Sequence, residues 1–135
     1  MNSDRLSAYA PQALAVLRIA AALLFIAHGT QKVLGFPAAE FSPPLFSMFG
    51  LAGIIEIVGG ILVLIGFQTR IAAFIMSGTM AVAYFMVHAP GNFFPANNGG
   101  DAAILFCFVF LYLVFAGPGA WSLDNGGKPA RVAIA

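Results

Sequence analysis

Residues 45–66, LFSMFGLAGIIEIVGGILVLIG, decide the fold of this chain, because the run holds one charged side chain, Glu56, among apolar residues. The hydrocarbon core of a bilayer is about 30 Å thick, and an α-helix of about 20 mainly apolar residues crosses it. Polar and apolar residues do not alternate along the run, which argues against a strand of a membrane β-barrel. The run therefore predicts a transmembrane helix.

The composition of the whole chain indicates the same class of protein. Of the 135 residues, 61% are hydrophobic and 8% are charged, whereas soluble domains carry about 25% charged residues and disordered chains are far less hydrophobic. Six Lys and Arg against five Asp and Glu give a net charge of +1, with no basic patch for nucleic acid. The single cysteine, Cys107, excludes a disulfide scaffold, a zinc ribbon and dithiol exchange within the chain.

Three further stretches are apolar enough to cross a bilayer, and turns rich in proline and glycine separate them. The four predicted spans are 13–34, 45–66, 71–88 and 101–115. We predict an all-α fold, an integral membrane four-helix bundle with up-down-up-down topology, which forms a single domain over residues 1–135. The tail, residues 124–135, is polar and is expected to be mobile.

The distribution of Lys and Arg predicts the orientation, because cytoplasmic loops carry an excess of positive charge. With a cytoplasmic N-terminus, the outer side receives only Lys32. Five basic residues then lie on the cytoplasmic side or extend toward it: Arg5, Arg18, Arg70, Lys128 and Arg131. Both termini are therefore predicted to be cytoplasmic, in a multi-pass protein of the inner membrane. The length of the first span, with Arg18 inside it, favours an uncleaved anchor over a secretory signal.

Polar side chains gather in the predicted outer half of the bundle. Ionisable residues within spans are costly and usually face the bundle interior or water. We expect six residues to line a cavity that opens to the non-cytoplasmic side and serves a ligand or protons: His28, Lys32, Glu56, Tyr84, His88 and Asp101. Imidazole changes its charge near neutral pH, so His28 is the expected proton carrier. The sequence assigns a catalytic role to none of them.

Glu56 lies near the middle of its span and needs a partner at that depth. Helical Cα–Cβ bonds lean toward the helix N-terminus, so Glu56 leans toward His28 and Lys32 and away from Arg18. We predict that Glu56 faces the bundle and pairs with the first span, with Lys32 as its charged partner. A stripe of small residues on the same face permits close approach of another helix. Glu56 is then either a structural link between helices or part of a ligand or proton site, and the sequence leaves both interpretations open.

Two other kinds of site depend on isolated residues rather than on a motif. His28 and His88 lie on different predicted helices at similar depth, as axial haem ligands do, but two histidines at helix ends arise easily by chance. These histidines could bind a metal together with Glu56 and Asp101, although no paired metal motif is visible. Cys107 lies among phenylalanines and is expected to be an inert buried residue. The sequence therefore assigns no metal and no certain cofactor.

Four short segments, one from each predicted span or the turn beside it, form a combination of motifs. They are Arg18 with His28-Gly29-x-x-Lys32, then Glu56-x-x-Gly59-Gly60, then Gly66-x-x-Thr69-Arg70, and finally Gly117-Pro118-Gly119-x-x-Ser122-Leu123-Asp124. The combination covers about residues 18–124 and resembles the DoxX family of small four-helix membrane proteins.

The resemblance implies a redox-associated membrane subunit, because the family takes its name from a subunit of a terminal or thiosulfate:quinone oxidoreductase. A quinone is the cofactor that this interpretation allows, and the six polar residues could supply its hydrogen-bond donors and protons. The implied partners are the lipid bilayer, redox enzyme subunits and a second copy of the chain. If the chain is an enzyme, we expect a quinone-linked oxidoreductase subunit. Structural roles are expected for Arg18, Gly59, Gly60, Arg70, Gly117, Pro118 and Gly119.

Three alternatives remain open beside the quinone. The ligand could be a small apolar molecule, the chain could be a non-catalytic membrane scaffold for partner proteins, or it could be a small transporter or proton pathway. Apart from Arg18, polar residues do not continue into the predicted cytoplasmic half, which disfavours a continuous pathway.

Overall fold

The computed structural model describes residues 3–126, and every regular element within them is a helix. In chain order these are α1 Ser3–Ser7, α2 Ala10–Leu34, α3 Met48–Ile65, α4 Thr69–Ala83, η1 Tyr84–His88, η2 Ala89–Gly91, α5 Pro95–Asn98 and α6 Asp101–Ala116. Three stretches are long and apolar enough to cross a membrane, namely α2, α3 and the continuous helical stretch Thr69–Gly91, and α6 is a shorter apolar helix. The expected all-helical membrane protein is confirmed.

Local signals explain where the long helices begin and end. The Oγ atom of Ser47 accepts a hydrogen bond from the Gly50 N–H at 3.2 Å, so α3 begins at Met48 rather than at residue 45. The helix of the first predicted span, α2, begins at Ala10 rather than at residue 13. Pro11 lies in its first turn, where the backbone N–H groups have no partner within the helix, so the N–H that proline lacks is not needed. Gly35 and Gly66 end α2 and α3 in the left-handed conformation, each with φ of 68°.

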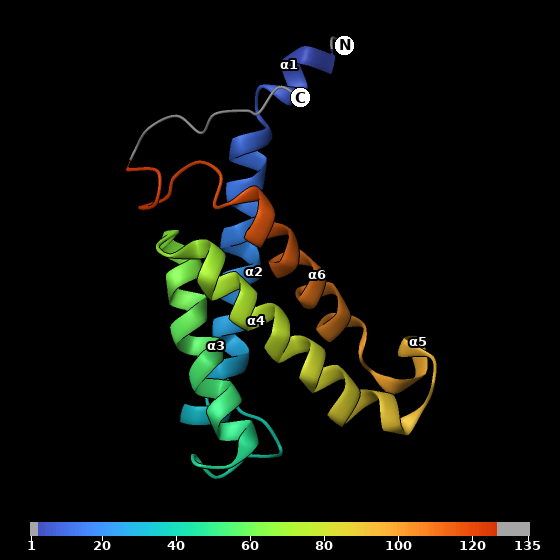
Figure 1. Ribbon diagram of the computed structural model, residues 1–135. Helices are drawn as coiled ribbons and strands as arrows, with labels where there is room; N and C mark the ends of the chain where they lie inside the picture. Colours follow the sequence, from blue (N-terminus) through green and yellow to red (C-terminus); the bar gives the residue numbers. More distant parts are fainter. Residues whose placement is uncertain (1–2, 127–135) are drawn as a thin grey trace.

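The helices form two pairs, α2 with α3 and α4 with α6 (Figure 1). The pairs meet near the end of the molecule that carries α1 and residues 117–126. They diverge toward the opposite end, where the α2–α3 loop and α5 lie. We call these the tied end and the open end. Lys128 and Arg131, two of the basic residues on which the predicted orientation depends, lie outside the described residues.

The buried core lies where the two pairs meet. Phe25 of α2 packs edge-on against Phe110 of α6, with ring centroids 4.9 Å apart, and both side chains are buried. Met76 of α4 is fully buried in the same cluster. The Oγ atom of Ser77 donates a hydrogen bond of 2.8 Å to the Cys107 carbonyl, which links α4 to α6.

The last part of the third predicted span is not a regular α-helix. Residues 84–88 form the π-helical turn η1, and the short 3₁₀ turn η2 follows. A π turn widens the helix locally, and such turns occur frequently at functional sites. Here it carries Tyr84 at its start and His88 at its end, two of the predicted site residues.

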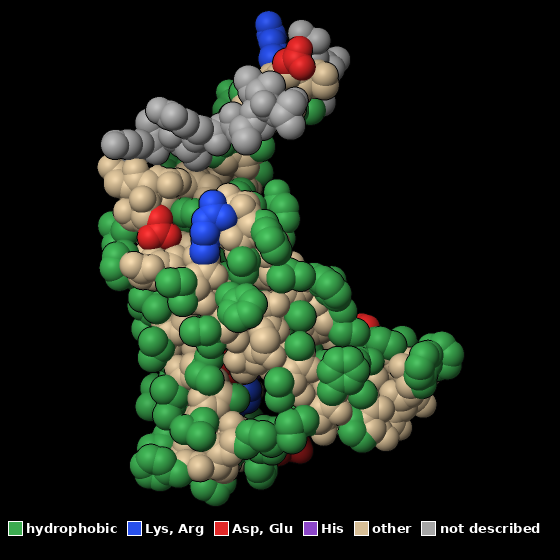
Figure 2. Space-filling view, in the orientation of Figure 1, with side chains coloured by type: hydrophobic (Ala, Val, Ile, Leu, Met, Phe, Trp, Pro, Cys, Tyr) green, Lys and Arg blue, Asp and Glu red, His purple; other side chains and the backbone are tan. Residues whose placement is uncertain are grey.

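The outer surface over the helices is mainly hydrophobic, and the few charged side chains in this view are most prominent at the tied end (Figure 2). Large apolar side chains such as Leu24, Phe74 and Phe115 are more than half exposed. A surface of this kind would meet water unfavourably and suits contact with lipid.

Arg18 has a different environment from the one expected. Instead of extending to the cytoplasmic interface, its side chain is fully buried at the tied end. Its guanidinium donates hydrogen bonds to the carbonyl oxygens of Pro118, of Ala120 at 3.0 Å and of Trp121 at 2.8 Å. Arg18 therefore joins the segment after α6 to α2.

Two further contacts fix the same end. The carboxylate of Asp124 accepts hydrogen bonds from the backbone N–H groups of Gln68 at 2.8 Å and Thr69 at 3.0 Å, at the start of α4. Arg70 donates to the carbonyls of Val114 and Phe115, both at 2.7 Å, in the last turn of α6. The expectation of a mobile tail from residue 124 is therefore wrong for Asp124, which caps a helix, while residues 127–135 lie outside the described part.

Candidate functional site

An ion pair joins α2 to α3 at the open half of the bundle. The Nζ atom of Lys32 lies 2.5 Å from Oε1 of Glu56, and the side chains are 28% and 1% exposed, respectively. The prediction that Glu56 faces the bundle and pairs with Lys32 is confirmed. The second carboxylate oxygen, Oε2, is buried and has no hydrogen-bond partner among the residues described. An oxygen of this kind remains able to accept a proton or a hydrogen bond.

Glycines bring the two helices close enough for this pair to form. A β-carbon at Gly53 would lie 2.9 Å from Cβ of Lys32, and one at Gly29 would lie 2.8 Å from the carbonyl oxygen of Gly53. Real β-carbons do not make contacts this short, so the two backbones approach more closely than larger residues would permit. Gly29 and Gly53 therefore set the spacing at which the lysine meets the carboxylate.

Gly59 and Gly60 lie against two different neighbouring helices. A β-carbon at Gly60 would lie 2.6 Å from Cγ1 of Ile26 on α2, and one at Gly59 would lie 2.6 Å from Sδ of Met76 on α4. The two glycines therefore let α3 pack against one helix from each pair.

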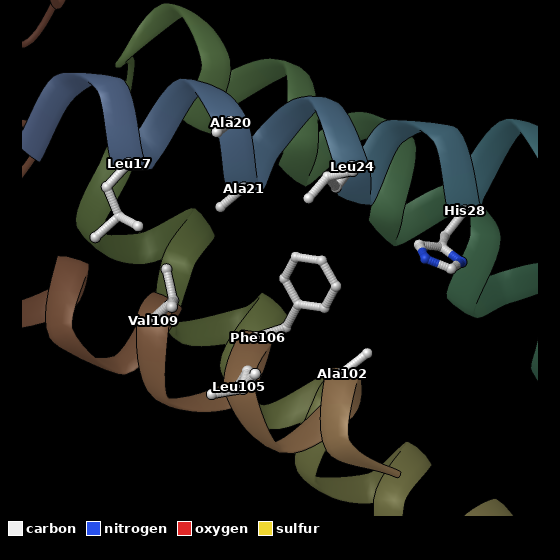
Figure 3. Close-up of a pocket in the computed structure, with 9 residues that line it drawn as sticks. All are labelled: Leu17, Ala20, Ala21, Leu24, His28, Ala102, Leu105, Phe106 and Val109. Atoms are coloured by element: carbon white, nitrogen blue, oxygen red, sulfur yellow. The ribbon is translucent and has the colours of Figure 1, made fainter. Parts of the chain in front are cut away.

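A pocket of about 440 Å³ lies between α2 and α6 (Figure 3). Eight of its nine lining side chains are apolar, and the ninth is a histidine. The lining residues are Leu17, Ala20, Ala21, Leu24, His28, Ala102, Leu105, Phe106 and Val109. Of the six predicted site residues, His28 is the one that lines this pocket, so the structure supplies an apolar site with one polar group.

His28 connects the pocket to the ion pair. Its ring meets that of Phe106 edge-on, with centroids 6.3 Å apart. Along α2 it lies one turn before Lys32, so both side chains are on the same face of the helix. The histidine therefore lines the pocket and lies one helical turn from Lys32, the basic member of the ion pair.

A second polar group is built on the opposite helix pair. Nδ1 of His88 lies 3.1 Å from the Asn98 carbonyl oxygen, and the Asn98 amide donates to the Tyr84 hydroxyl at 3.2 Å. Because a carbonyl oxygen can only accept, Nδ1 of His88 carries the proton of this bond. Asn98 was not a predicted site residue, and the available signal was its place in the Asn97–Gly100 turn before the fourth span.

Asp101 is exposed in the first turn of α6, where a carboxylate interacts favourably with the helix dipole. The other three predicted site residues, on α2 and α3, are His28, Lys32 and Glu56. Within residues 3–126, no hydrogen bond or ion pair links Tyr84, His88 or Asp101 to any of them. The same residues contain no cluster of three or more His, Cys, Asp or Glu side chains that could hold a metal ion. A single cavity shared by all six predicted residues stays a prediction.

Comparisons with known proteins bear on the identity of the chain. An uncharacterized protein of Haemophilus influenzae is 48% identical, over 90% of this chain and 96% of the relative. Inner membrane protein YqjF of Escherichia coli is 32% identical, over 82% of this chain and 88% of the relative. An uncharacterized membrane protein of Mycobacterium tuberculosis is 31% identical, over 89% of this chain and 84% of the relative. No solved structure gives a significant match. The family model for DoxX matches residues 13–89.

Proposed function

Because this chain belongs to the DoxX family, we propose that it is a redox-associated membrane subunit that binds a quinone-like or small apolar ligand. Its relatives in Escherichia coli are named inner membrane proteins, and its helices are those of a multi-pass membrane protein. The proposal concerns what such a protein does in that membrane.

The observation that carries the proposal is the position of His28 at the wall of the apolar pocket between α2 and α6. Ligand sites are typically apolar cavities in which a few polar groups fix the orientation of the ligand. A quinone fits this description, because its ring is apolar and its carbonyl oxygens accept hydrogen bonds. An imidazole N–H of His28 is a suitable donor to one of these oxygens.

The ion pair behind His28 supports a role in proton supply. Reduction of a quinone to a hydroquinone takes up two electrons and two protons. In this proposal the electrons come from a redox enzyme partner, and the protons pass through His28 from the neighbouring Lys32 and Glu56. Glu56 suits this role because its Oε2 atom is buried without a hydrogen-bond partner in the described structure.

The proposed topology is up-down-up-down with both termini cytoplasmic, which places the tied end toward the cytoplasm. The tied end carries Arg18 and Arg70, and the α2–α3 ion pair with Lys32 lies toward the other end. This distribution of basic residues agrees with the excess of positive charge on the cytoplasmic side of membrane proteins. The part of the pocket that His28 lines then lies in the outer half of the bilayer.

The test measures binding of duroquinone, a quinone without a chain, to the purified protein in lipid nanodiscs. Thermal stabilisation of the native protein is expected, since a ligand that binds only the folded state raises its stability. His28→Leu should abolish the stabilisation. Gln31→Leu is the matched control, because it removes a polar side chain of α2 that does not line the pocket, and it should leave the stabilisation intact.

The alternative is a non-catalytic scaffold for partner proteins. If duroquinone and small apolar compounds such as durene all fail to stabilise the native protein, the ligand proposal is wrong and the scaffold takes its place.

A further inference from the structure

The two ends of the pocket between α2 and α6 differ in chemistry (Figure 3). At one end lies His28, whose ring meets edge-on that of Phe106, nearer the middle of the pocket. At the other end lie Leu17 and Val109, and no polar side chain lines that part. One end therefore suits a planar group with a hydrogen-bonding atom, and the other suits an aliphatic group.

The pocket is also long compared with its width. Its lining on α2 extends from Leu17 to His28, which spans about 16 Å at the helical rise of about 1.5 Å per residue. Spread over that length, a volume of about 440 Å³ leaves a mean cross-section of about 27 Å². A mean cross-section of this size admits one ring or one hydrocarbon chain. A compact molecule bound at His28 would therefore leave the part of the pocket near Leu17 unfilled.

We propose that the ligand is a lipid-soluble amphiphile with a planar polar head at His28 and Phe106 and a single hydrocarbon chain that runs toward Leu17. This inference rests on the proposed function and selects between a chain-bearing ligand and a small apolar one. Ala20 and Ala21, on the α2 side, are small enough to leave room for the chain.

The chain contributes through shape rather than through the hydrophobic effect. Lipid tails are as apolar as the leucines that line the pocket, so a chain gains little by moving from the bilayer into the protein. A chain also raises the concentration of any ligand in the membrane. The test must therefore change the pocket while the ligand and the membrane stay the same.

The experiment uses the full chain in phosphatidylcholine nanodiscs with two probes that share one ring, ubiquinone-0 and decylubiquinone. Ala20→Phe fills the aliphatic part, and we expect it to weaken decylubiquinone about tenfold and to leave ubiquinone-0 unchanged. Ala27→Phe is the matched control, because Ala27 is another exposed alanine of α2 but does not line the pocket, and it should change neither affinity. Equal losses for both probes, or no loss for decylubiquinone, would overturn the inference.

A decylubiquinone with a diazirine at the end of its chain provides a second measurement that does not depend on a variant. Cross-links are expected near Leu17 and Val109, and excess decylubiquinone should suppress them. Cross-links beside Phe106 would contradict the proposal. Labelling that excess decylubiquinone does not suppress would also contradict it, because ordinary lipid would then fill the pocket. If the native protein binds neither probe, the proposed function fails first; if it binds both and labelling is misplaced, only the chain inference fails.

Discussion

Lys32 and Glu56 meet across the α2–α3 contact with Nζ and Oε1 2.5 Å apart, and the carboxylate is almost completely enclosed. Removal of one member of a buried pair leaves an uncompensated charge, whereas replacement of both by apolar groups is often neutral. The pair is therefore best tested by single and double substitutions.

Lys32→Met should lower the free energy of unfolding by about 2–3 kcal/mol, somewhat less than for a fully buried pair because Lys32 is 28% exposed. Lys32→Met with Glu56→Leu should recover most of this loss. Thermal unfolding in one detergent gives all the values. If the double variant is no more stable than Lys32→Met alone, Glu56 does not depend on the lysine for its burial.

Gly60→Leu should prevent α3 from packing against α2, because even a β-carbon at this position would lie 2.6 Å from Ile26. We expect a loss of about 3 kcal/mol or more, at the upper end for overpacking. Gly78→Leu is the matched control, since a β-carbon at Gly78 meets nothing within 4 Å. The yield and melting temperature of the two purified variants should differ clearly, and equal values would show that the α2–α3 spacing is not fixed by Gly60.

Arg18→Gln should release the segment that follows α6, because glutamine cannot reach three carbonyl oxygens at once. Hydrogen bonds to a charged group contribute about 1.5–3 kcal/mol each, and here they share one guanidinium. Faster backbone hydrogen exchange is expected for residues 118–122, measured by mass spectrometry. Arg5→Gln removes an exposed basic residue of α1 and should leave that exchange unchanged. Protection that survives in Arg18→Gln would assign the anchoring to other contacts.

The cap formed by Asp124 predicts a loss of local protection in acid. Burial acts to raise the pKa of Asp124, but hydrogen bonds from Thr69 and Gln68 and the charge of Arg18 outweigh it, so the pKa lies below its ordinary value of 3.8. A lowered pKa stabilises the folded state above the ordinary value, and the stabilisation disappears as the pH falls through the lowered one. After correction for the intrinsic exchange rate, the protection of the backbone N–H groups at the start of α4 should therefore stay constant above about pH 5, where this carboxylate is fully ionised, and should decrease below pH 3.8. Asp124→Asn should already exchange fast at neutral pH, with no such acid transition.

Reporter fusions test the proposed orientation. A reporter inserted after Gln68 and one at the C-terminus should both give cytoplasmic signals, because the basic residues of the described chain concentrate at the tied end. A fusion between Gly35 and Pro44 should give a non-cytoplasmic signal. A non-cytoplasmic signal from either of the first two would reverse the assignment of the leaflets.

The helices and the ion pair could be predicted from the sequence because both depend on local rules. Apolar runs bounded by proline and glycine give the spans, and the lean of Cβ atoms directs Glu56 toward Lys32 rather than toward Arg18. The environment of Arg18 could not be predicted in this way. Its partners lie roughly a hundred residues later in a segment without regular structure, and nothing in the local sequence specifies that fold-level contact.

The site was predicted less completely than the fold. Helical periodicity assumes 3.6 residues per turn, so it could not show the π turn that carries Tyr84 and His88 or the role of Asn98 beside them. The pocket at His28 depends on the angle between α2 and α6, which arises from packing at Phe25 and Phe110 and not from either helix alone.

The divergence of the two helix pairs gives the molecule unequal widths in the two leaflets of a bilayer (Figure 1). The tied end is narrower than the open end, where α3 and α4 have separated. A protein that is wider in one leaflet than in the other fits best in a curved membrane whose convex side is the leaflet with the wider end. Strongly curved regions of the membrane should therefore be enriched in this protein relative to a straight-sided bundle of the same size.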